Sequence, residues 1–476
     1  MVNDIDVNIR GVWWLPDVPG RQVRGSLSIG DRLELTLEES LTKPPPPTVG
    51  IIESFPKDTW DTFPAIHGLT PDGDEYTLLE TWGGSIHFPI EFTQTHTETW
   101  RAQAILKGAH LLDSDLITEI RMSTDYLWDW TNSNQHHVNW DLAKKTVTVT
   151  GGRTSLCKVR VNGSVFELVA GIKTQPFGKN GFQIEDQAVW NVKCTPGLDW
   201  GTTLREVVIP LQSFATFCTS RANRVTELTL MIANSTTEIR VFTNLRGHDL
   251  PIRDDRRHLE YFQVLPSRVF LMAPHSILER WFISWNELRD SISRMLSVEY
   301  ATSIYLEHRL ASVVQAAEGM HKVRWNSTKI GKTEYRSRRF RVMEECPLEL
   351  RSWLYAMLNG KNNLSLAERL RDIVNRAISA GCPYVILDIE KFVSALSASR
   401  NRTAHGSSAG EDYEGQHWLA EGLTWLLRTL ILVDLGLTSE QISLCLGPNL
   451  ELSRVASALH WQRAPGTTTT VTMTRT

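Results

Sequence analysis

The period of the hydrophobic pattern changes once along this chain and divides it into two unlike halves. Up to about residue 265, apolar and polar residues alternate, as at Leu33, Leu35 and Leu37, which is the repeat of half-buried β-strands. Beyond that point apolar residues recur every three or four positions, for example along 301–320, as in amphipathic helices. The pattern predicts an α+β protein, with a mostly β, sandwich-like domain followed by an all-α helical bundle.

The predicted domains follow from this change and from the length of the chain. A chain of 476 residues is too long for one ordinary core, so two domains are expected. Within the first, Asn162 and Gly163 stand between two alternating runs, where a type I′ hairpin turn needs them. We predict a β-rich domain over 1–265, a helical domain over 276–462 and a disordered Thr-rich tail over 463–476.

Charge and cysteine usage exclude several classes of protein. The 50 basic residues are balanced by 54 acidic ones, so any nucleic-acid site must be local. The six cysteines form no CxxC pair and have no histidine at ligand spacing, which argues against a zinc site and a disulfide framework and for a reducing cytoplasm. The apolar run 423–437 contains Arg428 and Asp434 and is shorter than a membrane span requires, so a buried helix is predicted. We expect no cofactor and no membrane association.

A polar run, ASRNRTAHGSS at 398–408, has the chemistry of a metal-independent ribonuclease. RNA supplies its own nucleophile, the 2′-hydroxyl, and the protein must add a proton acceptor, a proton donor and positive charge for the phosphorane. Histidine as a residue type titrates near neutrality, so His405 suits the first two tasks, whereas the guanidinium group of Arg400 suits the third. We predict Arg400, Asn401 and His405 as the catalytic residues.

The spacing of these residues raises a geometric difficulty. On a continuous helix Arg400 and His405 diverge by about 140°, whereas Asn401 and His405 are one turn apart, so that Asn401 can orient the imidazole. This favours a helix end or a site completed by a second chain. The spacing itself is not distinctive, since Arg253 and His258 share it without the asparagine. A solvated helix terminus or an ion-paired loop is the alternative interpretation of the run.

A second candidate is the basic run HKVRWNSTKIGKTEYRSRRFR at 321–341, which contains a single acid and interleaved aromatic residues. Such a composition is typical of a groove for an RNA backbone, with charge for the phosphates and rings for stacking. A solvated connector between helices fits it equally well. The residues predicted to bind RNA are Arg336, Arg338, Arg339, Arg341 and, from the first run, Arg402.

The run ASRNRTAHGS lies between one amphipathic helix and another, HWLAEGLTWLLRTLILVDLGL, and resembles the RNxxxH pattern of HEPN domains from prokaryotic defence and toxin systems. The segment LEHRLASVVQAAEGMHK at 306–322 resembles an early helix of the Apea-like HEPN group. Segments 11–29 and 66–82 are similar to strands of the N-terminal domain that accompanies that group. Together these resemblances cover most of the chain.

The resemblance implies an anti-phage, abortive-infection protein of the ApeA type, in which a sensor-like β-domain governs a HEPN endoribonuclease. It carries the catalytic roles over to Arg400, Asn401 and His405. HEPN nucleases act as dimers with two motifs face to face, so a homodimer or larger homo-oligomer is implied. The implied partners are RNA, tRNA included, and a phage-encoded trigger protein. The alternative is a non-catalytic HEPN module that binds RNA or mediates assembly.

Overall fold

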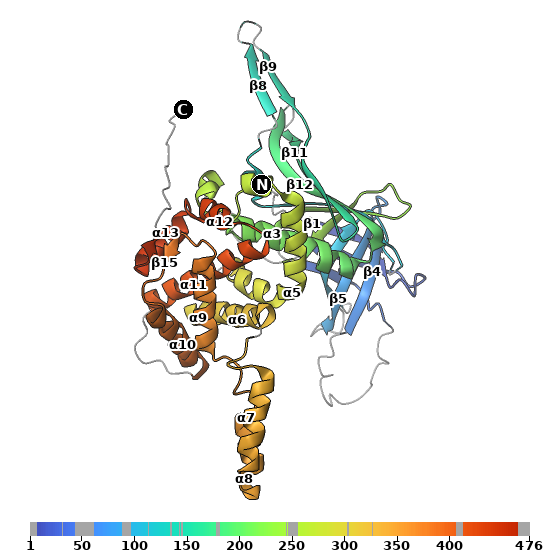
Figure 1. Cartoon of the computed structure of the whole chain (residues 1–476). Coiled ribbons are helices and arrows are strands. Elements are labelled where there is room, and N and C mark those ends of the chain that lie inside the picture. Colours follow the sequence, from blue (N-terminus) through green and yellow to red (C-terminus); the bar gives the residue numbers. More distant parts are fainter. Residues whose placement is uncertain are drawn as a thin grey trace, which may run out of the picture. The chain divides into compact units, whose positions relative to one another are not determined.

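The computed structural model divides into two compact units, residues 1–215 with 222–254, and 216–221 with 255–476. Strands dominate the first unit and helices the second, which confirms the predicted fold class (Figure 1). The residues that the structure describes are 7–30, 32–42, 61–87, 97–112, 114–133, 136–141, 143, 146–177, 181–243, 245, 256–301, 304–325, 327–405 and 413–464.

The strands of the first unit follow one another with few helices between them. Its strands are β1 (Val7–Trp14), β2 (Val23–Ile29), β3 (Leu33–Leu37), β4 (Asp61–Leu69), β5 (Glu75–His87), β6 (Thr97–Lys107), β7 (Ile117–Thr124), β8 (His136–Asp141), β9 (Thr146–Gly151), β10 (Thr154–Val161), β11 (Ser164–Phe177), β12 (Gly181–Leu198), β13 (Val225–Ile232) and β14 (Ile239–Thr243). The helical segments are α1 (Leu127–Thr131), α2 (Trp200–Thr203), the π-helix η1 (Leu204–Val208) and α3 (Ile209–Thr219), whose last residues belong to the second unit.

The first six strands close into a barrel. Their order is β6-β3-β2-β1-β4-β5, and β5 pairs back with β6 along its whole length. One edge of β6 is shared, because Glu98–Arg101 pairs with β3 and Ala104–Lys107 with β14. The strands β14, β13, β7, β12, β11 and β10 continue from there as an open antiparallel sheet. The predicted β domain is therefore a barrel joined to an open sheet through one shared strand.

Alternation along these strands builds the core of the barrel. Leu35 and Leu37 are fully buried, as the period-two pattern predicts. Trp13 and Trp100 fill the interior with large rings and have no exposed surface. The hairpin between β10 and β11 turns at Asn162 and Gly163, whose φ angles of 47° and 84° fit the predicted turn.

The second unit is a helical bundle. Its elements are the 3-10 helix η2 (Arg256–Tyr261), α4 (Ser267–Phe270), α5 (Pro274–Tyr300), α6 (Leu306–Arg324), α7 (Lys332–Glu344), α8 (Leu348–Leu358), α9 (Leu366–Ser379), α10 (Ile389–His405), α11 (Tyr413–Asp434), α12 (Ser439–Leu446), α13 (Leu450–Ala458) and a ribbon of β15 (Tyr384–Val385) and β16 (Gln462–Arg463). Helix α11 packs on α5, α6, α9, α10 and α13. Its side chains Leu423, Leu426 and Ile431 have no exposed surface, so the apolar run is a buried helix as predicted. Among the described helices, none is long and apolar enough to cross a membrane.

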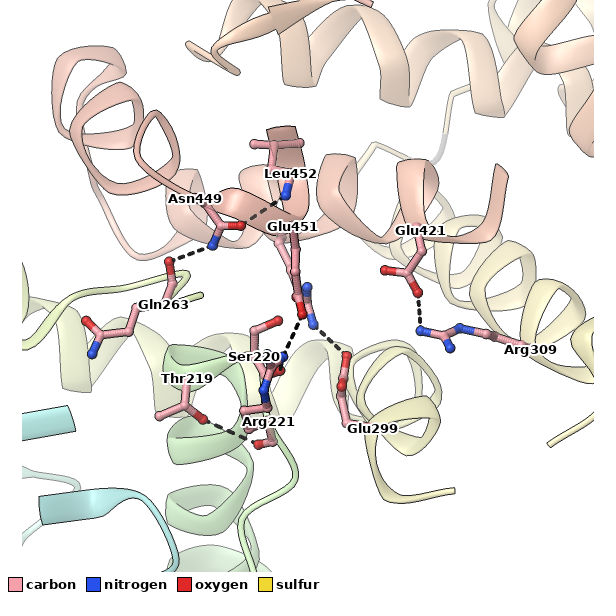
Figure 2. A network of polar contacts seen from close by, with 11 residues as sticks. Thr219, Ser220, Arg221, Gln263, Glu299, Arg309, Glu421, Asn449, Glu451 and Leu452 are labelled. Atoms are coloured by element: carbon pink, nitrogen blue, oxygen red, sulfur yellow. Dashed lines mark hydrogen bonds and ion pairs between the residues drawn. The ribbon is translucent and has the colours of Figure 1, made fainter. Parts of the chain in front are cut away.

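The bundle also buries charges in pairs. Arg221, just after α3, donates to Glu451 of α13 at 2.8 Å, and Arg309 of α6 pairs with Glu421 of α11 (Figure 2). Arg428 of α11 has only 1% of its side chain exposed and lies 2.8 Å from Glu299 of α5.

The buried position of Glu421 raises the pKa of its carboxyl group, although Arg309 acts in the opposite direction. These pairs connect helices that are distant in sequence, and each cation compensates an acid that would otherwise be costly to bury.

Candidate active site at the end of helix α10

Helix α10 carries the polar run at its carboxyl-terminal end. The side chain of Asp388 accepts a hydrogen bond from the backbone N–H of Lys391 at 2.9 Å and so caps the start of the helix. Val393 and Leu396 are buried where α10 packs on α6, α9 and α11. The polar Ser399 lies on the same buried face and is 3% exposed. The apolar stripe therefore fixes which face of α10 is turned toward the bundle.

The motif continues from this buried stripe onto the outer face of the helix. Arg400, next to Ser399, is half-buried, and Asn401 is exposed. A weak contact of 3.5 Å joins Nη1 of Arg400 to Oδ1 of Asn401. The backbone stays helical through His405, whereas the side chains of Arg402 and His405 lie outside the described residues.

The helical repeat relates the motif positions to the buried face. Taking about 100° per residue, positions 401 and 405 lie about 140° and 180° around the axis from the buried Leu396. The exposed Asn401 therefore lies on the face of α10 that is turned away from the bundle. The structure brings Asn401 and position 405 to one face, and it places Arg400 closer to the buried side.

Position 405 is the last residue of α10 that the structure describes, and residues 406–412 after it lie outside the described residues.

Other titratable groups lie on the helices that flank α10. Arg309 of α6 and Glu421 of α11 form an ion pair, and one turn before Glu421 lies His417. Burial, together with the positive charge of Arg309, lowers the pKa of the His417 imidazole. The sequence does not predict the ion pair of Arg309 and Glu421, because no local pattern pairs two side chains that are 112 positions apart.

The basic run forms the end of α6, a short connection and helix α7. Arg336, Arg338 and Arg341 are exposed, whereas the guanidinium group of Arg339 lies 4.7 Å from the ring centroid of Tyr355. Arg338 forms an ion pair with Glu334 one turn earlier.

Two of the aromatic residues of the basic run are less available for stacking on RNA bases than the sequence indicates. Arg376 covers Trp325 at 4.5 Å, and the half-buried Tyr335 donates its hydroxyl hydrogen bond to the carbonyl of Leu358. Phe340, in contrast, is 63% exposed. RNA binding by the arginines of this run stays a prediction.

No cluster of three or more histidine, cysteine, aspartate or glutamate side chains is placed to hold a metal ion in the part of the chain that the structure describes.

Residues 8–289 match the family model of ApeA N-terminal domain 1. The chain belongs to the ApeA family. Residues 311–441 match the Apea-like HEPN model, a stretch that includes α10 and its motif. Searches among curated proteins and among solved structures found no match.

Membership in the ApeA family makes this chain part of a defence-associated group that carries a HEPN nuclease domain. HEPN domains are generally ribonucleases and typically form dimers. The first match covers the strand-rich unit and continues into α5 of the helical unit, and the second match lies within the helical unit.

Proposed function

We propose that this ApeA-family protein is an anti-phage endoribonuclease that cleaves RNA without a metal ion through Arg400, Asn401 and His405. One observation supports it above others: the RNxxxH run lies on helix α10 of the matched HEPN domain, with Asn401 on the outer face. Arg402 is proposed to hold the RNA beside the motif. Cleaving cellular RNA, tRNA included, would stop phage growth by abortive infection.

In the proposed reaction the 2′-oxygen attacks the adjacent phosphorus and the bond from phosphorus to the 5′-oxygen breaks. One histidine accepts the proton of the 2′-hydroxyl, and the 5′-oxygen takes a proton from a second acid. Arg400 compensates the charge of the phosphorane, and Asn401 orients the imidazole one turn away. The products are a 2′,3′-cyclic phosphate and a 5′-hydroxyl.

A second copy of the chain would supply what one motif lacks. One histidine cannot conveniently serve as base toward the 2′-hydroxyl and as acid toward the 5′-oxygen in the same step. Asn401 is exposed on the outer face of α10, so two copies can present their motifs to one RNA. The β-rich unit is proposed to restrain this site until it senses a phage-encoded trigger.

The test compares Arg400→Ala and His405→Ala with Lys391→Ala, which changes an exposed residue at the other end of the same helix. Each motif variant should abolish the toxicity of the expressed protein and its protection against phage, while Lys391→Ala keeps both. Circular dichroism should show the same helix content in all three. Toxicity that survives in folded His405→Ala protein would overturn the proposal, and RNA binding without cleavage by the wild type would favour a non-catalytic module.

A further inference from the structure

Helices α7 and α8 form a hairpin that is an arm of the helical unit (Figure 1). Its base is closed by Asn362, whose amide group accepts from the backbone N–H of Ile330 at 3.0 Å and donates to the carbonyl of Ile330 at 2.9 Å. Near the base, Tyr335 of α7 also binds the carbonyl of Leu358 at the end of α8. The hairpin is thus held where it leaves the bundle.

No side chain of α7 or α8 is buried, although the structure describes every residue of both helices. The seam between them holds only half-buried side chains, such as Met343 and Leu354. Helices of 13 and 11 residues are marginal in water without a packed face. A hairpin of this kind needs a further surface to cover it.

One face of the hairpin is apolar and uncovered. Leu350, Trp353 and Met357 repeat at i, i+3 and i+7 along α8, and all are exposed, Trp353 by 60%. On α7, Val342 is exposed as well. Contiguous exposed apolar side chains mark interaction surfaces, and tryptophan and arginine are the residues that most often dominate their affinity.

The flank of α7 that borders this face carries both signs of charge. Arg338 and Val342 of α7 and Glu345, the helical-conformation residue directly after it, repeat at i, i+4 and i+7, so they lie on one stripe. On the other side of the hairpin, away from both stripes, the two helices meet in a groove lined by Phe340 and Tyr355, among others. The stripe of α7 and the stripe of Leu350, Trp353 and Met357 therefore belong to one common face, which we name the Trp353 face.

The charges of the Trp353 face are placed for pairing with a copy of itself. Arg338 and Glu345 are seven residues apart, about 10 Å along α7. The contact of Arg339 with Tyr355 sets the two helices in register, and Trp353 then lies about level with the midpoint between Arg338 and Glu345. A two-fold axis through Trp353 brings Arg338 of each copy opposite Glu345 of the other.

We propose that the Trp353 face is a self-association surface, on which the hairpins of two copies pack antiparallel around a two-fold axis at Trp353. Leu350 and Met357 of the two copies then cover one another, and two Arg338–Glu345 pairs flank them. Arg338 can exchange its partner, because the exposed pair with Glu334 contributes little. An RNA backbone would repel Glu345 and leave the aliphatic side chains uncovered, so a second copy fits this face better than RNA does.

The test exchanges charges on the full-length chain. Arg338→Glu and Glu345→Arg should each place like charges opposite one another twice, weaken association by about tenfold or more and halve the mass of the assembly in light scattering. Mixing the two variants should restore the mass, because both pairs are then opposite in sign. The double variant should also associate with itself.

Two further outcomes separate this proposal from its alternatives. If the hairpin instead binds RNA, Arg338→Glu should weaken RNA binding, Glu345→Arg should strengthen it, and mixing should change nothing. An unchanged mass in both single variants overturns the self-association surface. Loss of cleavage is not the readout, so failure of this proposal and failure of the catalytic proposal are distinguishable. Both substitutions change exposed side chains, and circular dichroism checks that the fold is kept.

Discussion

Replacing Arg428 by methionine should destabilise the helical unit strongly. Its guanidinium group lies 4.6 Å from the ring centroid of Trp425 and 2.8 Å from a carboxylate oxygen of Glu299. Methionine keeps most of the apolar stem and removes the charge, so Glu299 is left without its partner in a site where its side chain is 16% exposed.

Removing one member of a buried ion pair costs about 3 to 5 kcal/mol. The residual exposure of Glu299 favours the lower end, and we expect a loss of about 3 kcal/mol in the free energy of unfolding. Adding Glu299→Leu removes the unpaired charge, so the double variant should return to within about 1 kcal/mol of the wild type. Arg454→Met, on an exposed position of α13, should change stability by less than about 0.5 kcal/mol.

The assay is urea unfolding followed by circular dichroism at a helix-sensitive wavelength, with the three variants beside the wild type. Two results would refute the reasoning. The first is an Arg428→Met protein as stable as the Arg454→Met control. The second is a double variant that unfolds as easily as Arg428→Met alone, because the cost would then come from lost packing and not from an unpaired charge.

Two further predictions concern the helical unit. Burial holds the pKa of His321 below its ordinary value despite its hydrogen bond to Asp372. As the pH drops below about 6.5, the unfolded chain therefore takes up a proton at this residue before the folded protein does. The free energy of unfolding should fall over this range. In urea titrations His321→Gln should reduce that fall, and parallel pH curves would contradict it. Asn362→Ala removes both hydrogen bonds to Ile330, which should cost about 2 kcal/mol of local stability at the base of the hairpin. Limited trypsin digestion should therefore cut within α7 faster than in the wild type, with the other cleavage sites unchanged.

Local patterns predict the elements of this fold, and pairings between distant segments decide how they are joined. The turn at Asn162 and Gly163 and the buried run of α11 are visible in the sequence, because each depends on neighbouring residues. Closure of the barrel is not, since β6 takes β3 and β14 on one edge and β5 on the other. No alternation of apolar residues specifies which strands pair.

The same limit applies to the candidate site and to the hairpin. The chemistry of Arg400 and His405 can be predicted from residue types, but the direction in which the motif faces depends on the burial of Leu396 and Ser399. The sequence of α8 predicts an ordinary amphipathic helix. Its hydrophobic pattern does not show that the rest of the chain leaves Trp353 exposed. A periodic stripe shows that a partner surface is needed, and only the fold shows whether the chain supplies it.

Cleavage of an RNA that carries a single 2′-deoxy nucleotide at the mapped cut site tests the catalytic proposal most directly. The assay contains EDTA and compares this substrate with the all-ribose RNA, using wild-type protein and His405→Ala. We expect a 2′,3′-cyclic phosphate from the ribose substrate, no cut at the deoxy position, and a rate about 10² to 10⁴ lower in the variant. Cleavage of the deoxy substrate at the same position, or products ending in a 3′-hydroxyl, would contradict attack by the 2′-hydroxyl.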